Sequence, residues 1–595
     1  MFTQLTHAIR HWIRSQEQLY LGALALAIGA LAGYGALGIR FGIESVSAFW
    51  TGQIAWSQAI GFIPWYIYII APTSAGLLVG IINKHLLAGE ARVIPGVLEA
   101  LSEKNGRISP KKTISEFISN TVSVGSGASM GREAPTVALG ASLASLCGQL
   151  FRLSDKQLRT LVGCGVAAGI AASFNAPIAG VLFSLEVILA DYAVATFTPI
   201  VLSSVIATVI TRAHLGGLPM YDIPEFRLVS SLEIPAYIGM GVCCGLIGAL
   251  IVRLMPVSRR LFAIHVPDIM FRPMIAGLII GVYALIVPEV MSIGYGVVEN
   301  ILMENIDSRI LGMAIPVTIF LFILIVSKIL TSVICSGAGF GGGMIGPSIF
   351  IGISVGALYG GIAHSVFPEI SETYGAYALV ASGALLAATI QAPMSTILMV
   401  FELSGNYEIM IPLMAACVVA ALVKRIFGKE SAITESLEER GIETGWGLER
   451  SRMKAVPITR IPWRGIPSVL ENASLADLKH TYITSGKGCV QVVNELGDMV
   501  GIVTFADLQQ WLLDPTLDHI VIAAEVANKH VLTIAENASL LDAIRVLDRE
   551  IFEQMPVVSK DNPRKVLGIL SRNAIFSKYH KLIVQHGEEA AERSS

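Results

Sequence analysis

The sequence predicts an α-helical protein that crosses a membrane many times and ends in a smaller, soluble α/β part. Of its 595 residues, 53% are hydrophobic and only 15% are charged, and the mean hydropathy is +0.66. Soluble domains usually carry about 25% charged residues, so this composition indicates that most of the chain lies in a lipid bilayer. Polar and charged residues concentrate toward the C-terminus, which predicts two structurally distinct parts.

We expect five segments along the chain. They are a cytoplasmic segment 1–17, a transmembrane domain 18–441 with repeat halves at about 18–230 and 231–441, a linker 442–455, a pair of α/β units 456–580, and a tail 581–595. A cleaved signal peptide is one interpretation of the apolar run Leu19–Ile39, but the apolar spans that follow favour an uncleaved first membrane helix. Because the soluble units carry no export signal, both termini are predicted to face the cytoplasm from a multi-pass protein of the cell (inner or plasma) membrane.

The apolar spans are irregular in length. One candidate span covers Ile178–Thr211, and several others are broken by Gly or Pro or are shorter than the roughly 20 residues that cross a bilayer. Interrupted helices persist at membrane depth only where protein buries them or where they line a cavity. This pattern favours a transport pathway.

An internal repeat supports this interpretation. The sequence APIAGVLFSLE begins at Ala176, and APMSTILMVFE begins at Ala392. GREAP, which ends at Pro135, has a counterpart in GMIGP, which ends at Pro347, and each follows a glycine-rich run. Several matches in the same order indicate a duplicated membrane fold, which is typical of transporters whose site lies where the halves meet. Parallel and inverted halves are both compatible with these matches.

The first of these motifs places one charged pair, Arg132 and Glu133, inside an otherwise apolar region. The glycine-rich approach allows another atom or ion to come close to the backbone, and Pro135 suits the first turn of a helix. A helix start exposes unpaired N–H groups and the positive end of the helix dipole, which together favour an anion. Glu133 places a carboxylate, itself an anion, at this point. In isolation, such a stretch is more often a helix-start glutamate on a surface loop.

Four motifs in order resemble the chloride channel and transporter (CLC) family: GSGASMGREAP, FNAPIAGVLFSLE, GAGFGGGMIGP and APMSTILMVFELSGNY. The resemblance covers about residues 20–441. It implies two inverted repeats in each subunit, a homodimer with one pore per subunit, and helix N-termini that converge on a dehydrated anion, chloride or a similar small ion. It also implies that Glu133 is the gating glutamate, which occupies an anion site when deprotonated and leaves it when protonated or displaced.

The same resemblance implies a set of anion-binding positions: Arg92, Val93, Ile94, Gly131, Arg132, Ala134, Met344, Ile345 and Ile433. Three of them depart from the family pattern. Arg92 stands where a serine usually contacts the anion, and either its side chain pairs with the anion or its backbone N–H serves instead. Ile345 replaces a phenylalanine. Ile433 replaces the tyrosine that closes the inner end of the site, which should loosen the inner gate.

A fourth departure concerns proton coupling. Exchangers of this family often carry a second glutamate that relays protons, and its position here is Val187, which cannot bind a proton. We therefore expect a channel-like permease, with a Cl⁻/H⁺ antiporter that uses another proton route as the alternative. The repeat-related Glu186 and Glu402 are expected to tie helix ends together, and Lys328 and Arg132 to be satisfied structural charges.

Residues 456–580 contain two similar α/β units. In each unit a strand, a turn, a second strand and a helix start follow one another, a pattern typical of a compact domain. The two units resemble a pair of CBS domains. The resemblance implies an adenine nucleotide near Thr504, Asp507, Ser571 and Asn573, although Thr504-x-x-Asp507 is equally an ordinary helix N-cap. No cofactor is expected to be required.

Other functions are disfavoured by the sequence. A CBS-bearing transporter of cations such as Mg²⁺ is a further alternative, but it should show clusters of acidic residues in the membrane part, where the acids are few and isolated. The sequence contains no Ser-His-Asp set, metal-binding motif or P-loop, so we expect neither an enzyme nor a metal site. It has no basic run long enough for nucleic acid. The seven cysteines lie almost entirely in apolar runs and are expected to be buried and unpaired.

Overall fold

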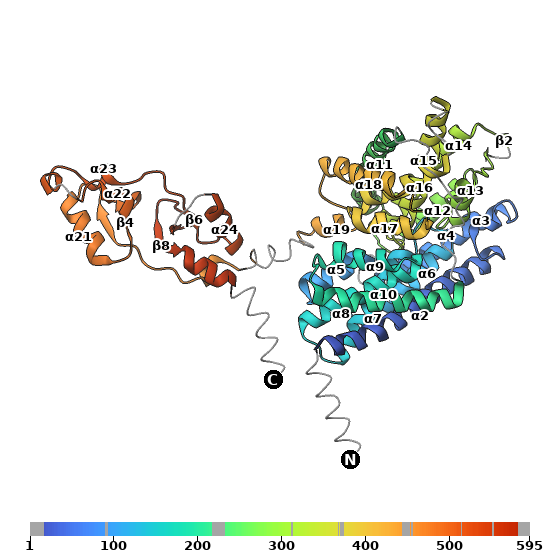
Figure 1. Cartoon of the computed structure of the whole chain (residues 1–595), viewed down its shortest axis with the longest axis horizontal. Coiled ribbons are helices and arrows are strands. Elements are labelled where there is room, and N and C mark those ends of the chain that lie inside the picture. Colours follow the sequence, from blue (N-terminus) through green and yellow to red (C-terminus); the bar gives the residue numbers. More distant parts are fainter. Residues whose placement is uncertain are drawn as a thin grey trace, which may run out of the picture. The chain divides into compact units, whose positions relative to one another are not determined.

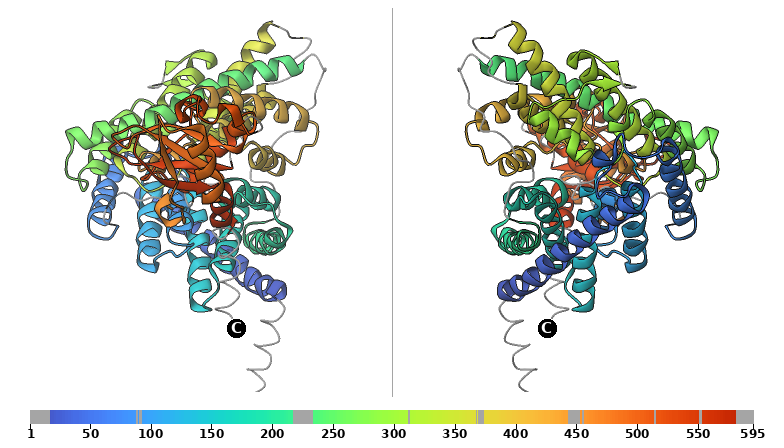
Figure 2. Two further views of the ribbon diagram at one scale, coloured as in Figure 1. Left: turned by 90° about the vertical axis from the view of Figure 1, so that its left-hand side faces the viewer. Right: turned by 90° about the vertical axis from the view of Figure 1, so that its right-hand side faces the viewer.

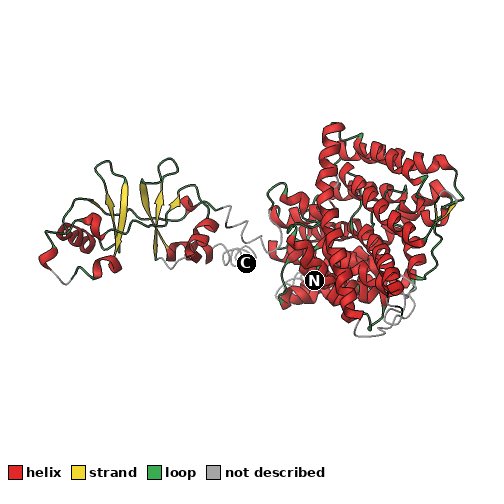
Figure 3. Ribbon diagram, turned by 90° about the horizontal axis from the view of Figure 1, so that it is seen from above, coloured by secondary structure: helices red, strands yellow, loops and turns green. Residues whose placement is uncertain are grey.

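The computed structural model describes residues 17–87, 89, 93–216, 233–310, 313–366, 368, 374–442, 453, 456–512, 515–549 and 553–580. The chain divides into two compact units, Met1–Gly445 and Trp446–Ser595. Most of the expected N-terminal segment and linker, and all of the expected tail, lie outside the described residues. Of the described strands, β1 and β2 belong to the first unit and the others to the second (Figure 1, Figure 3).

The first half of the membrane unit is a series of helices joined by short turns. Its elements are α2 (Glu17–Thr51), α3 (Trp56–Ala59), α4 (Trp65–His85), α5 (Val93–Glu103), α6 (Pro110–Gly125), α7 (Glu133–Leu150), α8 (Asp155–Phe174), α9 (Pro177–Phe183), the π-helical turn η1 (Ser184–Leu189) and α10 (Val194–Leu215). The long α2 helix lies at the surface of the bundle (Figure 2, dark blue).

The second half follows the same plan. Its elements are α11 (Ile234–His265), α12 (Arg272–Ala284), the 3-10 turn η3 (Pro288–Val290), α13 (Tyr295–Leu302), β1 (Arg309–Ile310), β2 (Met313–Ala314), α14 (Val317–Ala338), α15 (Ile345–Val366), α16 (Tyr374–Ile390), α17 (Pro393–Ser404), α18 (Met410–Ile426) and α19 (Glu435–Glu438). Within the described residues, seven helices are long and apolar enough to cross a membrane, and α12, α16 and α17 are shorter apolar helices. The predicted mixture of full and interrupted spans is confirmed.

The expected single span Ile178–Thr211 is wrong. The chain leaves α9 through the π-helical turn η1, and Ala190 then takes a left-handed conformation with φ of 50°. The Asp191 carboxylate accepts a hydrogen bond from the backbone N–H of Ala193 at 2.9 Å, and α10 begins at the next residue, Val194. Residues with φ above zero rarely continue a helix, so the apolar run is divided into α9 and α10.

Helices α8 and α16 are the buried centres of the two halves, and their ends show the duplication in the backbone. Each is followed by a left-handed residue, Asn175 in one half and Gln391 in the other, both with φ of 57°. An Ala-Pro pair then starts α9 or α17. Because left-handed residues other than glycine are uncommon, their occurrence at equivalent places supports the repeat found in the sequence.

Small residues bring neighbouring helices into close contact. A Cβ atom added to Gly140 of α7 would meet the backbone carbonyl of Gly165 in α8, and one added to Gly165 would meet that of Gly140. In the second half, a Cβ atom on Gly352 of α15 would lie 2.6 Å from Cα of Ser382 in α16. Membrane helices pack in this way where side chains are absent from the contact. These contacts hold α7 against α8 and α15 against α16.

The second unit contains two three-stranded sheets of the same topology. Its elements are the 3-10 turn η5 (Ile458–Arg460), β3 (Ser468–Leu470), α21 (Leu475–Ser485), β4 (Cys489–Val493), β5 (Met499–Thr504), α22 (Phe505–Gln509), the 3-10 turn η6 (Pro515–Leu517), α23 (Ala523–Val526), β6 (Ile534–Ala535), α24 (Leu540–Arg549), β7 (Gln554–Val558) and β8 (Val566–Ser571). In each sheet the first strand pairs in parallel with the second, and the second pairs antiparallel with the third.

The two sheets also share a detail and a contact. The antiparallel register shifts between Val492 and Val493 in one sheet and between Val557 and Val558 in the other. A small apolar cluster contains Cys489, Ile502 and Ile569, which come from both sheets. The predicted pair of similar α/β units is therefore confirmed, and the two form one compact body.

Candidate anion site

Three helices of the membrane unit begin with the same pattern, two residues followed by proline. α5 starts with Val93-Ile94-Pro95, α7 with Glu133-Ala134-Pro135 and α15 with Ile345-Gly346-Pro347. The first N–H groups of a helix have no intrahelical acceptor, and proline has no N–H to add to them. Each start therefore presents two backbone donors beside a positive dipole end, an arrangement that favours an anion.

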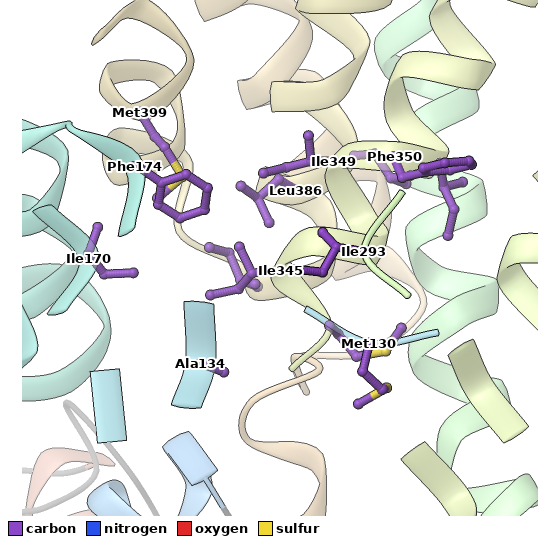
Figure 4. Close-up of a cluster of buried hydrophobic side chains, with 14 of the residues drawn as sticks. Met130, Ala134, Ile170, Phe174, Ile293, Ile345, Ile349, Phe350, Leu386 and Met399 are labelled. Carbon is purple, nitrogen blue, oxygen red and sulfur yellow. The ribbon is translucent and has the colours of Figure 1, made fainter. Parts of the chain in front are cut away.

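A cavity of about 330 Å³ is lined by residues from all three helix starts. Six of the nine expected anion positions line it: Val93, Ile94, Ala134, Met344, Ile345 and Ile433. Apolar Met130, Phe340 and Ile390 complete much of the wall. Figure 4 shows Met130, Ala134 and Ile345 in this buried apolar region. Because apolar side chains cannot replace water as ligands, an ion beside this part of the wall would depend on the backbone N–H groups.

Glu133 is the first residue of α7 and is completely buried. The Tyr295 hydroxyl donates a hydrogen bond to Oε1 of its carboxylate. Oε2 has no hydrogen-bond partner among the described residues. It lies beside the start of α15, since a Cβ atom on Gly346 would be 3.0 Å from it. The carboxylate thus lies at the positive ends of two helices, where a free anion would also be stabilised.

Gly131 and Gly343, which are repeat counterparts, hold the two halves together at this point. The Gly131 N–H donates to the Gly343 carbonyl at 2.8 Å, and the Gly343 N–H donates to the Gly131 carbonyl at 3.0 Å. A Cβ atom on Gly343 would collide with Cβ of Ala134. The pairing therefore requires glycine, and it brings the start of α15 against the start of α7.

Two other expected positions do not line the cavity, and one lies outside the described residues. Gly131 acts through its backbone, as described above. Arg132 is the N-cap of α7, and its guanidinium carbon lies 5.2 Å from the centre of the Tyr295 ring. Arg92 lies outside the described residues. Tyr295 itself was not predicted, because its stretch has no counterpart among the repeat motifs; its only signal is an aromatic residue between Gly294 and Gly296.

Glu186 and Glu402 hold helix starts of the opposite halves. The Glu402 carboxylate accepts hydrogen bonds from the N–H groups of Ile178 at 3.0 Å and Ala179 at 2.7 Å, at the start of α9. The Glu186 carboxylate accepts from the N–H groups of Met394 at 3.2 Å and Ser395 at 2.8 Å, at the start of α17. These contacts agree with a structural role for both carboxylates.

Val187, where a proton-relay glutamate would stand, lies in the π-helical turn η1 and is half-buried. It is not among the residues that line the 330 Å³ cavity. π-helical turns are rare and insert one residue into a helix. The same turn contains Glu186, whose carboxylate accepts hydrogen bonds from the start of α17.

Lys328 of α14 is completely buried, and its ammonium group donates to two backbone carbonyls, Val290 at 3.0 Å and Ser292 at 2.8 Å. It also lies 4.7 Å from the centre of the Phe350 ring, a cation–π distance. Lys328 does not line the cavity. Its contacts agree with the structural charge expected from the sequence.

Charged residues lie at one end of the cavity. Arg259 of α11 binds the Glu435 carboxylate through both guanidinium nitrogens, at 2.6 Å and 3.2 Å, and Glu439 at 2.8 Å. Ile433, the position of the missing tyrosine, lies two residues before Glu435 and is buried. All four side chains line the cavity, together with Ser336, Ser436 and Arg440, and Ile433 itself brings no hydroxyl to it.

Three of the four candidate nucleotide residues of the second unit, Thr504, Asp507 and Ser571, make local hydrogen bonds at helix starts. Asp507 Oδ2 accepts from the Thr504 N–H at 2.8 Å and the Thr504 hydroxyl at 2.7 Å, which caps α22. The Ser571 hydroxyl oxygen accepts from the Ala574 N–H at 3.2 Å, and Asn573 is exposed.

The second unit also contains a buried thiol. The Cys489 thiol donates to Gln554 Oε1 at 3.0 Å, and burial raises the pKa of this thiol to about 11.

The membrane unit matches the family model described as voltage gated chloride channel over residues 75–425, and the second unit matches the CBS domain model at 458–514 and 523–581. The chain belongs to this chloride channel family. It is therefore a multi-pass membrane protein of the CLC family with a CBS pair, and the function common to the family is anion transport.

Relatives in the CLC family include exchangers as well as channels. The chain is 34% identical to the ClcB-like protein of Ralstonia nicotianae over 66% of its own length and 90% of that protein. It is 26% identical to the H(+)/Cl(-) exchange transporter ClcA of Vibrio parahaemolyticus, over 67% and 82% of the two chains. The crystal structure of a slow cyanobacterial Cl⁻/H⁺ antiporter shares the fold, with a TM-score of 0.64 and 24% identity over 71% and 97% of the two chains.

Proposed function

We propose that the chain is a chloride permease with one pore in each subunit of a homodimer, gated by Glu133. The buried Glu133 carboxylate carries this proposal, because its Oε2 lies at the start of α15 and has no hydrogen-bond partner in the part of the chain that the structure describes. An incoming chloride ion and the carboxylate would compete for the same helix starts. Protonation would neutralise the carboxylate and weaken its hold on that position.

We further propose that conduction is channel-like. Val187 has no titratable group, and the adjacent Glu186 is bound to the start of α17. Ile433 supplies no hydroxyl at the inner end of the cavity, which lowers the barrier to an ion that leaves the site. The second candidate function is Cl⁻/H⁺ antiport through another proton route, and it is favoured by the relatives described as exchangers.

The measurement that separates the two functions uses purified protein in liposomes loaded with KCl. Chloride efflux and external pH are recorded together while valinomycin fixes the voltage. Chloride flux without proton movement supports the channel-like permease. Uphill proton movement driven by the chloride gradient supports the antiporter, and an absence of chloride flux contradicts both.

We also propose that the protein lies in the cell membrane with both termini in the cytoplasm. Its membership of a family of membrane proteins supports the membrane location. CBS domains generally bind adenine nucleotides, so ATP or AMP at the second unit is also proposed. Thr504 and Asp507 would have to give up part of their mutual bonding to contact it. Calorimetric titration of the whole protein with ATP and AMP tests this, and no heat with either nucleotide contradicts it.

A further inference from the structure

We propose that Tyr295 is a positioning residue for Glu133 and that its hydroxyl latches the carboxylate in the closed position. The inference rests on the proposed gating role of Glu133. The latch would set how readily a proton or an incoming anion displaces the carboxylate, and therefore the chloride flux at neutral pH.

The first support is the asymmetry of the Glu133 carboxylate. The Tyr295 hydroxyl donates to Oε1, whereas Oε2 has no partner among the described residues. Buried carboxylates are stable only when donors satisfy them. Tyr295 therefore supplies the side-chain hydrogen bond that offsets the burial of this group, and its loss would leave Glu133 held mainly by the helix dipole.

The second support is that Tyr295 contacts two consecutive residues of the other half. Its ring lies under the guanidinium of Arg132, at 5.2 Å, while its hydroxyl reaches the carboxylate of Glu133. Tyr295 starts α13 in the second half, and Glu133 starts α7 in the first. A single side chain thus holds both charged residues of the motif at the boundary between the halves.

The third support is the rigidity of the loop that carries Tyr295. The Ser292 N–H donates to the Gly127 carbonyl at 2.9 Å, and the Ser292 hydroxyl donates to the Val124 carbonyl at 3.0 Å. The Lys328 ammonium donates to the Ser292 carbonyl at 2.8 Å. Gly294 has φ of 84° and packs so closely on Phe350 that a Cβ atom would lie 2.6 Å from the ring. The tyrosine is therefore presented from a fixed position.

The latch also predicts a pH effect. A hydrogen bond to a charged carboxylate is stronger than one to a neutral group, so the Tyr295 hydroxyl favours the deprotonated, closed arrangement. Arg132, over the Tyr295 ring, and Lys328, bonded to the Ser292 carbonyl, are the charged side chains that the described contacts place against this assembly. Removal of the hydroxyl should allow opening at a lower proton concentration.

The experiment measures chloride efflux from liposomes at fixed voltage across a range of pH. Tyr295→Phe keeps the ring over Arg132 and removes only the hydroxyl. We expect flux at neutral pH to rise roughly tenfold and the pH midpoint of flux to move upward. Tyr283→Phe is the matched control, because the Tyr283 hydroxyl is hydrogen-bonded to the Ser327 hydroxyl at 2.7 Å and not to Glu133. This variant should keep the wild-type profile.

The double variant Tyr295→Phe/Glu133→Gln distinguishes a latch from general packing. If Tyr295 acts through Glu133, the double variant should have the same flux and pH profile as Glu133→Gln alone. An equal effect of Tyr295→Phe in both backgrounds would overturn the latch, as would a wild-type profile for Tyr295→Phe. If Glu133→Gln itself kept the wild-type pH dependence, the gate and the latch would fail together. A Glu133→Gln variant without pH dependence beside an unchanged Tyr295→Phe would refute the latch alone.

Discussion

Gly131 and Gly343 exchange two backbone hydrogen bonds, at 2.8 Å and 3.0 Å, and are equivalent residues of the two repeats. The bridge is antiparallel, as expected where two inverted halves meet on a local two-fold axis. The residues that follow it, Arg132-Glu133 in one half and Met344-Ile345 in the other, start α7 and α15. The candidate site therefore lies where equivalent residues of the two repeat halves contact each other.

Substitution of Gly343 tests this bridge. In Gly343→Ala the new methyl group would collide with Cβ of Ala134, and we expect a loss of about 1–3 kcal/mol in stability together with reduced chloride flux. Thermal unfolding in detergent and liposome efflux measure the two effects. Gly361→Ala in α15 is the control, because a Cβ atom there meets nothing within 4 Å. Equal behaviour of the two variants would show that close approach at Gly343 is unnecessary.

The gating role of Glu133 leads to a second prediction. In Glu133→Ala the carboxylate no longer competes for the helix starts, so chloride flux should persist or rise while its pH dependence and any proton coupling disappear. Efflux at several pH values measures this. Glu299→Ala, at an exposed glutamate of α13, should keep the wild-type profile. A pH-dependent turnover unchanged by Glu133→Ala would exclude this residue as the gate.

The carboxylates of Glu186 and Glu402, each of which binds a helix start in the opposite half and which we call the crossed carboxylates, give a third prediction. Glu402→Gln removes a charged acceptor from the N–H groups of Ile178 and Ala179, so the free energy of unfolding should fall by about 1.5–3 kcal/mol. Glu408→Gln is the control, since Glu408 is exposed. Unfolding midpoints in detergent measure both. Proton coupling, if present, should not change; a selective loss of coupling in Glu402→Gln would assign that carboxylate to transport instead.

The second unit allows a prediction about pH. The raised pKa of the Cys489 thiol, about 11, means that the protonated thiol predominates at all lower pH values and that the reactive thiolate forms only near and above pH 11. At pH 8, alkylation of Cys489 by iodoacetamide should be on the order of a hundredfold slower than that of a free thiol. Mass spectrometry of the modified peptide measures the rate, with guanidinium-unfolded protein as the reference. Fast labelling of folded protein would show that the two sheets separate readily.

Part of this architecture could be predicted from the sequence, because the residue types in its motifs indicate the local conformation of the backbone. A Gly-rich run followed by Glu133, Ala134 and Pro135 indicates a helix start, and the shared order of the motifs in the two halves indicates the duplication. The structural role of Glu186 and Glu402 also followed from their repeat relationship, and their contacts agree with it.

Other features could not be predicted, because they depend on contacts between distant segments. Tyr295 lies in a stretch without a repeat counterpart, and contacts of its loop with distant segments, Lys328 and Phe350 among them, bring it to Glu133. The division of the expected span Ile178–Thr211 depends on the left-handed Ala190, and neither hydropathy nor helix propensity signals such a residue.

The crossed carboxylates also impose an order on biosynthesis. The first turn of α9 emerges from the ribosome more than two hundred residues before Glu402, the acceptor that its N–H groups use in the finished protein. Until the second half enters the bilayer, these groups need lipid headgroups or water as substitutes, since hydrocarbon offers no acceptor. The hydrogen bonds that hold the start of α9 in the finished protein can therefore form only after Glu402 has been translated.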